Sequence, residues 1–273
     1  MIYKVGEILN KLEYCIVNKK PFSHIRFGDG GIKFLHAMIF DDSKQLAIIS
    51  KREGLPTDKL DEIFELWGYF ARKADFIDTP EVYFNGKFWP RMRTSFKGMT
   101  EQTEKRMKMW KDLYHRAEFD NENYCNPESN YLMVLKLGNQ RNLVNMMGGR
   151  RKICIITAKP EIKKVLSGLN VDVIEIVGHY ENQYKNSFHN VIDLIKNTAK
   201  NYDFWLVAAG ELGRIYSGTI KEHGGRAIDI GFIIEFWNGE NLHPRLELYM
   251  KRRIFSPLEL VLTQFSHCYK ESI

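Results

Sequence analysis

The chain has 273 residues, of which 44% are hydrophobic and 27% are charged. This balance is typical of a globular protein and excludes an intrinsically disordered chain. No apolar run approaches the roughly 20 residues that a transmembrane helix needs. The N-terminus also lacks the apolar stretch of a secretory signal peptide. We therefore expect a cytoplasmic protein without a membrane span.

The formal net charge of +6 at pH 7 suits an anionic partner such as a nucleotide, a nucleic acid or an acidic glycan. Aromatic residues are interleaved with basic ones between Lys87 and Lys111. Such a pattern occurs on surfaces that follow a phosphate backbone, but also on a solvated helix. The cysteines are far apart and form no C-x-x-C pair, so we expect free thiols and no zinc site; they are Cys15, Cys125, Cys154 and Cys268.

The N-terminal part of the chain predicts a helix, a strand, a glycine-rich turn and a second helix. Apolar residues recur at helical spacing over residues 6–19, and Pro21 ends this helix. A short apolar run over residues 22–25 predicts a strand, and helical spacing resumes from Ile32. Turns between a strand and a helix are where α/β proteins place their ligands.

The middle of the chain is expected to be mainly helical. The pattern predicts helices over residues 58–74 and 100–119 and a strand over residues 82–84. No linker rich in Gly, Pro or Ser separates this part from the rest. We therefore expect a single domain over residues 1–273, with a helical insertion at about 55–130.

The last third of the chain alternates regularly between strands and helices. Strands are predicted over residues 152–157, 171–177, 204–209 and 226–231, and helices over residues 160–166, 187–199 and 212–222. This alternation predicts an α/β, Rossmann-like fold with a mainly parallel sheet and helices on both faces.

The first candidate site is the turn over residues 26–31. Gly28, Gly30 and Gly31 allow the backbone to approach a ligand closely and leave N–H groups for phosphate oxygens. Arg26 could pair with a phosphate, and Asp29 could hold a divalent metal ion. The alternative is a tight turn in which Asp29 only caps the following helix.

Three further turns carry residues that could bind an anion. Gly210, Glu211 and Arg214 follow a predicted strand and lead into a helix, where a phosphate or a ribose can bind, although small residues there can also serve packing alone. Asp229 ends the last predicted strand and could act as a base, a metal ligand or an ion-pair partner of an arginine. Lys159 lies in another turn and could neutralise a diphosphate or simply be solvated.

Two of these segments together resemble the GT-D class of bacterial glycosyltransferases. The segments are Phe-Ser-His-Ile-Arg-Phe-Gly-Asp-Gly at residues 22–30 and the stretch over residues 208–231 that ends in Ala-Ile-Asp-Ile-Gly. Their order along the chain also matches. In that family the loop continues as Asp-x-Glu, whereas this chain has Gly31 at the glutamate position and Phe232 where a histidine is usual.

The resemblance implies a hexosyl- or pentosyltransferase that uses a UDP-sugar donor and a divalent cation, Mn²⁺ or Mg²⁺, at Asp29. The expected acceptor is a hydroxyl group on a glycan or a glycosylated protein. The expected catalytic residues are Asp29, Asp229 and Glu211. The residues expected to bind the nucleotide sugar are Arg26, Phe27, Gly28, Gly30, Lys159, Gly210 and Arg214.

Two other functions fit the sequence. The basic stretch from Lys87 to Lys111 would also suit a DNA-modifying glycosyltransferase that acts on hydroxylated bases. The loss of the motif glutamate at Gly31 would suit a nucleotide-binding or scaffold protein that kept the fold and lost the chemistry.

Overall fold

The structure is a computed structural model, and it describes residues 2–3, 5–27, 29–78, 124–125, 143–178 and 181–238. The predicted strand at 82–84, the predicted helix at 100–119 and the basic stretch from Lys87 to Lys111 lie outside these residues.

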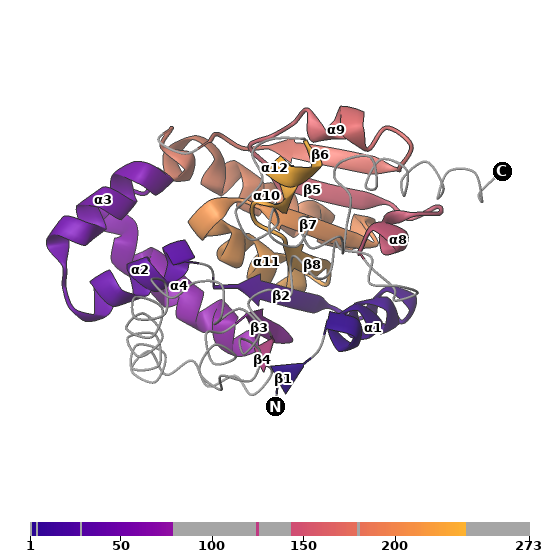
Figure 1. Ribbon diagram of the computed structural model, residues 1–273, viewed down its shortest axis with the longest axis horizontal. Helices are drawn as coiled ribbons and strands as arrows, with labels where there is room; N and C mark the ends of the chain where they lie inside the picture. The colour runs from indigo at the N-terminus through magenta and orange to yellow at the C-terminus, as the bar shows by residue number, and fades with distance from the viewer. Residues whose placement is uncertain are drawn as a thin grey trace, which may run out of the picture.

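The described strands form one eight-stranded parallel sheet in the order β1-β4-β3-β2-β8-β7-β5-β6. Figure 1 shows this sheet running through the middle of the molecule. The strands are β1 (Ile2–Tyr3), β2 (Phe22–Arg26), β3 (Phe76–Asp78), β4 (Tyr124–Cys125), β5 (Ile153–Thr157), β6 (Val171–Glu175), β7 (Phe204–Ala208) and β8 (Arg226–Asp229).

Helices cover both faces of the sheet (Figure 1). One face carries α2 (Asp29–Ile39), α3 (Ser43–Glu53), α4 (Leu60–Lys73), α10 (His189–Thr198) and α11 (Gly213–Glu222). The other face carries α1 (Val5–Val17), α8 (Leu143–Met147), α9 (Ile162–Val165) and α12 (Ile233–Trp237). Single turns of 3-10 or π helix lie at Thr57–Lys59, Tyr184–Phe188, Ala199–Asn201 and Gly210–Leu212. Within the described ranges, every helix is too short or too polar to cross a membrane.

Successive side chains of the central strands point alternately into two hydrophobic cores, one on each face of the sheet. On β7, Trp205 and Val207 pack into the core beneath α4, α10 and α11, while Phe204 and Leu206 pack into the core beneath α1 and α12. All four side chains are fully buried. A strand that is buried on both faces reads as a continuous apolar run, which explains why β5 and β7 were recognisable in the sequence. The predicted α/β fold with helices on both faces is confirmed.

Most predicted elements are present, with three differences in the N-terminal part of the chain. The helix α2 begins at Asp29, inside the predicted turn, so the aspartate and two of the glycines form its first turn. The helix α3 was not predicted, because Ile49 and Glu53 are its only buried residues and no apolar stripe results. The three-residue strand β3 was too short to give a pattern.

The predicted insertion at about 55–130 is described only in part. Its residues up to Asp78 belong to the main body, since α4 packs on α11 and β3 pairs with β2. The short strand β4 continues the same sheet beyond β3.

The crossing of α4 and α11 depends on Gly218. A Cβ atom at this position would overlap the ring of Phe70 and lie 2.6 Å from its Cβ. We expect Gly218→Ala to lower the free energy of unfolding by about 1–3 kcal/mol, because the added methyl group overpacks the contact. Chemical denaturation measures this change.

The matched control is Gly6→Ala in α1, where the added Cβ meets no atom within 4 Å. That variant should be neutral or gain up to about 1 kcal/mol, since alanine is the better helix former. If Gly218→Ala had the same free energy of unfolding as Gly6→Ala, the close packing inferred at Gly218 would be wrong.

Candidate functional site

A pocket of about 1160 Å³ lies at the carboxyl edge of the sheet. Since all strands are parallel, the segments that follow β2, β5, β6, β7 and β8 meet at this edge, and each of them contributes to the pocket. The polar residues that line it carry both signs of charge and include Arg26, Arg52, Glu53, Thr157, Lys159, Glu175, Glu181, Gln183, Glu211, Arg214, Asp229 and Glu235.

Arg214 is the most firmly held cation of the pocket. Its Nη1 lies 2.5 Å from Oε2 of Glu211, and both side chains are 5% exposed. The guanidinium carbon lies 4.2 Å from the ring centre of Trp67 and 5.2 Å from that of Phe27. A guanidinium held by a carboxylate and two aromatic rings has little freedom to move, so the structure fixes a positive charge at this place.

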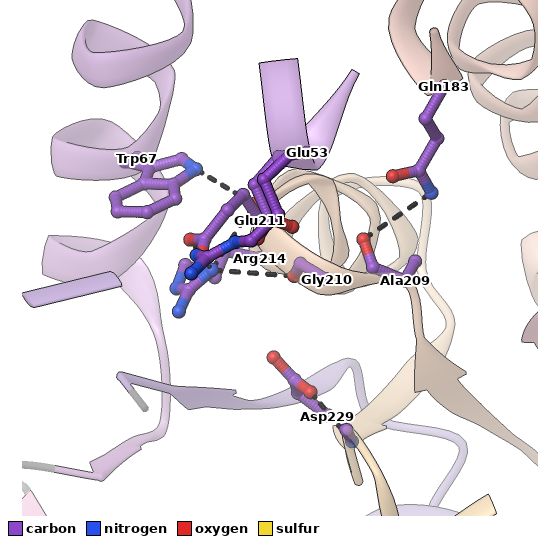
Figure 2. A network of polar contacts seen from close by, with 10 residues as sticks. Glu53, Trp67, Gln183, Ala209, Gly210, Glu211, Arg214 and Asp229 are labelled. Carbon is purple, nitrogen blue, oxygen red and sulfur yellow. Dashed lines mark hydrogen bonds and ion pairs between the residues drawn. The ribbon is translucent and has the colours of Figure 1, made fainter. Parts of the chain in front are cut away.

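Glu211 is held from both its side chain and its backbone. Trp67 of α4 donates a hydrogen bond from Nε1 to the Glu211 carbonyl at 3.0 Å. Figure 2 shows Glu53 of α3 beside Glu211 and Arg214. Burial raises the pKa of Glu211 to about 7, with Arg214 opposing this and Glu53 adding to it. A carboxyl group that titrates near neutral pH can accept or donate a proton during a reaction.

Asp229 ends β8 and is 4% exposed. Its Oδ1 accepts a hydrogen bond from the backbone N–H of Gly231 at 3.1 Å. Burial raises the pKa of Asp229, and the charges of Arg214 and Arg26 oppose the rise. In Figure 2 its carboxylate points toward the cluster around Arg214.

Arg26 is the last residue of β2 and lines the same pocket. Its guanidinium carbon lies 4.9 Å from the ring centre of Phe232. A Cβ atom at position 231 would overlap the Arg26 Nη1, and Gly231 has a φ of +52°, so this position requires glycine on both counts. Gly231 and Phe232, which follow β8, therefore determine where the guanidinium of Arg26 lies.

The structure brings most of the predicted site residues together. Arg26, Lys159, Gly210, Glu211, Arg214 and Asp229 all line the pocket. Phe27 lies behind them and contacts Arg214. Asp29 and Gly30 lie in the first turn of α2. Gly28 and the side chain of Asp29 are outside the described part of the chain.

Other residues of the site were missed from the sequence, among them Arg52, Glu53, Trp67 and Gln183. The first two come from α3, whose ends carry a recognisable signal. Asp42 accepts a hydrogen bond from the N–H of Gln45 at the start, and Gly54 ends the helix in a left-handed conformation two residues before Pro56. Gln183 donates a hydrogen bond to the carbonyl of Ala209 at 3.5 Å and lines the pocket.

The described part of the pocket, which does not include the side chain of Asp29, offers no ready set of ligands for a divalent metal ion. Nowhere in the described ranges do three or more His, Cys, Asp or Glu side chains gather as a possible ligand set. One oxygen of Glu211 is engaged by Arg214, and Oδ1 of Asp229 by a backbone N–H. The neighbouring guanidinium groups of Arg26 and Arg214 would repel a dication.

A pocket at the carboxyl edge of a parallel sheet, lined by basic side chains and buried carboxylates, is typical of α/β proteins that bind nucleotides. A family model described as "GT-D fold-like domain" matches residues 3–237. The chain therefore belongs to the GT-D-like family, a glycosyltransferase class of fold.

Among solved structures, the chain is similar to one described as "The highly conserved domain of unknown function 1792 has a distinct glycosyltransferase fold". The two share 15% sequence identity with a TM-score of 0.48, over 90% of this chain and 80% of the other. No curated protein matches the chain.

The raised pKa of Glu211 predicts a specific dependence of stability on pH. Between the ordinary value of 4.5 and about 7, the folded protein binds a proton at Glu211 that the unfolded chain has released. The free energy of unfolding therefore falls as the pH rises through that window, by about 3 kcal/mol at most. Glu211→Gln removes this dependence.

The measurement is chemical denaturation of both proteins at several pH values from below 4.5 to above 7. The difference in free energy of unfolding between wild type and variant should shift in favour of the variant as the pH rises. A difference that stays constant with pH would show that Glu211 has an ordinary pKa.

Proposed function

We propose that this protein transfers a sugar from a nucleoside diphosphate donor, with a UDP-sugar as the expected donor, to a hydroxyl group on a glycan or a glycosylated protein. The observation that carries the proposal is the convergence of Arg26, Arg214, Glu211 and Asp229 in one pocket of a GT-D-like chain. These residues come from three separate turns of the sequence.

The basic residues of the pocket suit the departing diphosphate. When the bond between the sugar and the diphosphate breaks, negative charge develops on the leaving oxygen. Arg214 and Arg26 are held by neighbouring aromatic rings, so their charges are in place before the reaction begins. Fixed charges that need no rearrangement stabilise the developing charge most effectively. Lys159 enters the same pocket from the turn after β5.

Of the two buried carboxylates, Asp229 is the better candidate for the base that accepts the acceptor's proton. Glu211 is bound to Arg214 at 2.5 Å, so its main role is to position that guanidinium. Asp229 receives a backbone N–H on Oδ1 and has a pKa raised by burial, which makes it a stronger base than an exposed aspartate. Asp29, at the start of α2, is proposed to position the donor.

The acceptor is tested together with the donor. Release of UDP is measured with a panel of hexose and pentose nucleotide sugars, alone and with glycans, glycopeptides and hydroxymethylated DNA as acceptors. The DNA alternative depends on the stretch from Lys87 to Lys111, outside the described residues. Binding of UDP without turnover on any donor would favour the scaffold alternative, and absence of both would reject sugar transfer. The cytoplasmic location expected from the sequence stays a prediction.

Replacing the proposed base gives the sharpest prediction. Asp229→Asn keeps the shape of the side chain and removes its basicity, so turnover should fall by about 100-fold or more while UDP affinity changes little. Steady-state kinetics and calorimetric titration with UDP separate the two effects.

Asp193→Asn in α10 is the matched control, since this aspartate side chain is 72% exposed and lies outside the pocket. It should leave both turnover and affinity unchanged. An Asp229→Asn variant with full turnover would remove Asp229 from the mechanism.

A further inference from the structure

Position 31 has no side chain, and the guanidinium of Arg214 occupies the space that a side chain would take. A Cβ atom on Gly31 would overlap Nη2 of Arg214 and would lie 3.0 Å from Cζ and 3.4 Å from Nε. Gly31 is in the first turn of α2, whose N-terminal N–H groups carry partial positive charge. The fixed charge of Arg214 therefore adds to that of the helix N-terminus.

The guanidinium has unused capacity to bind an anion. Nη1 binds Glu211, and the opposite edge, with Nε and Nη2, faces Gly31. Within the part of the chain that the structure describes, the buried Nε has no hydrogen-bond partner. Buried donors without a partner are rare in folded proteins, and Arg214 also lines the pocket, so its guanidinium is a candidate to receive an anionic group there.

A doubly charged cation would meet unfavourable surroundings at the same place. The described carboxylate beside Arg214, that of Glu211, is already engaged by it. A metal ion near Gly31 would lie next to a buried guanidinium, and the repulsion between two such charges is strong where water is excluded. Arg214 could leave only by giving up its contacts with Trp67, Phe27 and Glu211.

We infer that the guanidinium of Arg214 takes the place of a divalent cation at the donor diphosphate, so that donor binding by this protein needs no metal ion. The inference rests on the proposed function, since it concerns the diphosphate of the same donor. Arginine suits this role because its planar fork binds phosphate oxygens with two hydrogen bonds and stays charged at every relevant pH.

The test is calorimetric titration of the whole protein with UDP, once in EDTA and once with Mn²⁺. The affinity should be the same within error in both. A second titration, with Mn²⁺ alone, should show no binding to the free protein. Loss of UDP binding in EDTA and its recovery with Mn²⁺ would overturn the inference while supporting the donor.

Removing the guanidinium should weaken UDP binding. Arg214→Gln is expected to lose ~10–100-fold in affinity in EDTA, the range of one or two charge-assisted hydrogen bonds. Arg72→Gln is the matched control, because Arg72 is exposed on α4 and outside the pocket, and it should bind UDP like the wild type. An Arg214→Gln variant with full affinity for UDP would overturn the inference.

Arg214→Lys keeps the positive charge and loses the planar guanidinium. It serves as a second variant in case Arg214→Gln does not fold. It should bind UDP with an affinity between those of the wild type and Arg214→Gln, with unchanged circular dichroism. If the folded wild type binds no UDP in either buffer, the proposed donor itself is wrong and the inference falls with it.

Discussion

The contact between Arg214 and Glu211 connects the parts of the molecule on which the site depends. Glu211 is fixed by Trp67 of α4, and Arg214 lies against Trp67, Phe27 and the first turn of α2. The buried guanidinium of Arg214 therefore contacts three parts of the chain: the turn after β7, the turn after β2 and the helix α4. A buried ion pair contributes little net stability by itself, but loss of one partner leaves the other charge uncompensated. The cluster thus favours one arrangement of these elements.

Burial strengthens the electrostatic interactions of the charged groups in the pocket. It also costs free energy, because these groups are removed from water. Asp229 and Glu211 are each about 5% exposed or less, and burial raises the pKa of both. The guanidinium groups of Arg26 and Arg214 offset part of this cost for Asp229. Carboxylates that lie among fixed cations and have a pKa raised by burial are common in catalytic sites. Their raised pKa makes them stronger bases than exposed carboxylates.

Much of the fold could be predicted because β5, β7 and β8 are apolar on both faces, and their parallel order brings the turns after them to one edge. The convergence of Arg26, Arg214 and Asp229 follows from that rule alone. The helix α3 could not be recognised from apolar spacing, since only Ile49 and Glu53 are buried on it. The filling of position 31 by Arg214 was also not predictable, because it depends on the packing of α4 against two distant turns.

The absence of a glutamate at Gly31 changes less in the local charge than the sequence suggests. A carboxylate together with a divalent cation carries one net positive charge, and a guanidinium beside a glycine carries the same charge without a metal. This equivalence holds only if Glu211 does not cancel the charge of Arg214. Burial raises the pKa of Glu211, so near neutral pH this carboxyl group offsets the charge of Arg214 less than an ordinary carboxylate would. In the proposed binding mode, the buried environment of Glu211 and the missing side chain at position 31 therefore both favour contact between Arg214 and the donor diphosphate.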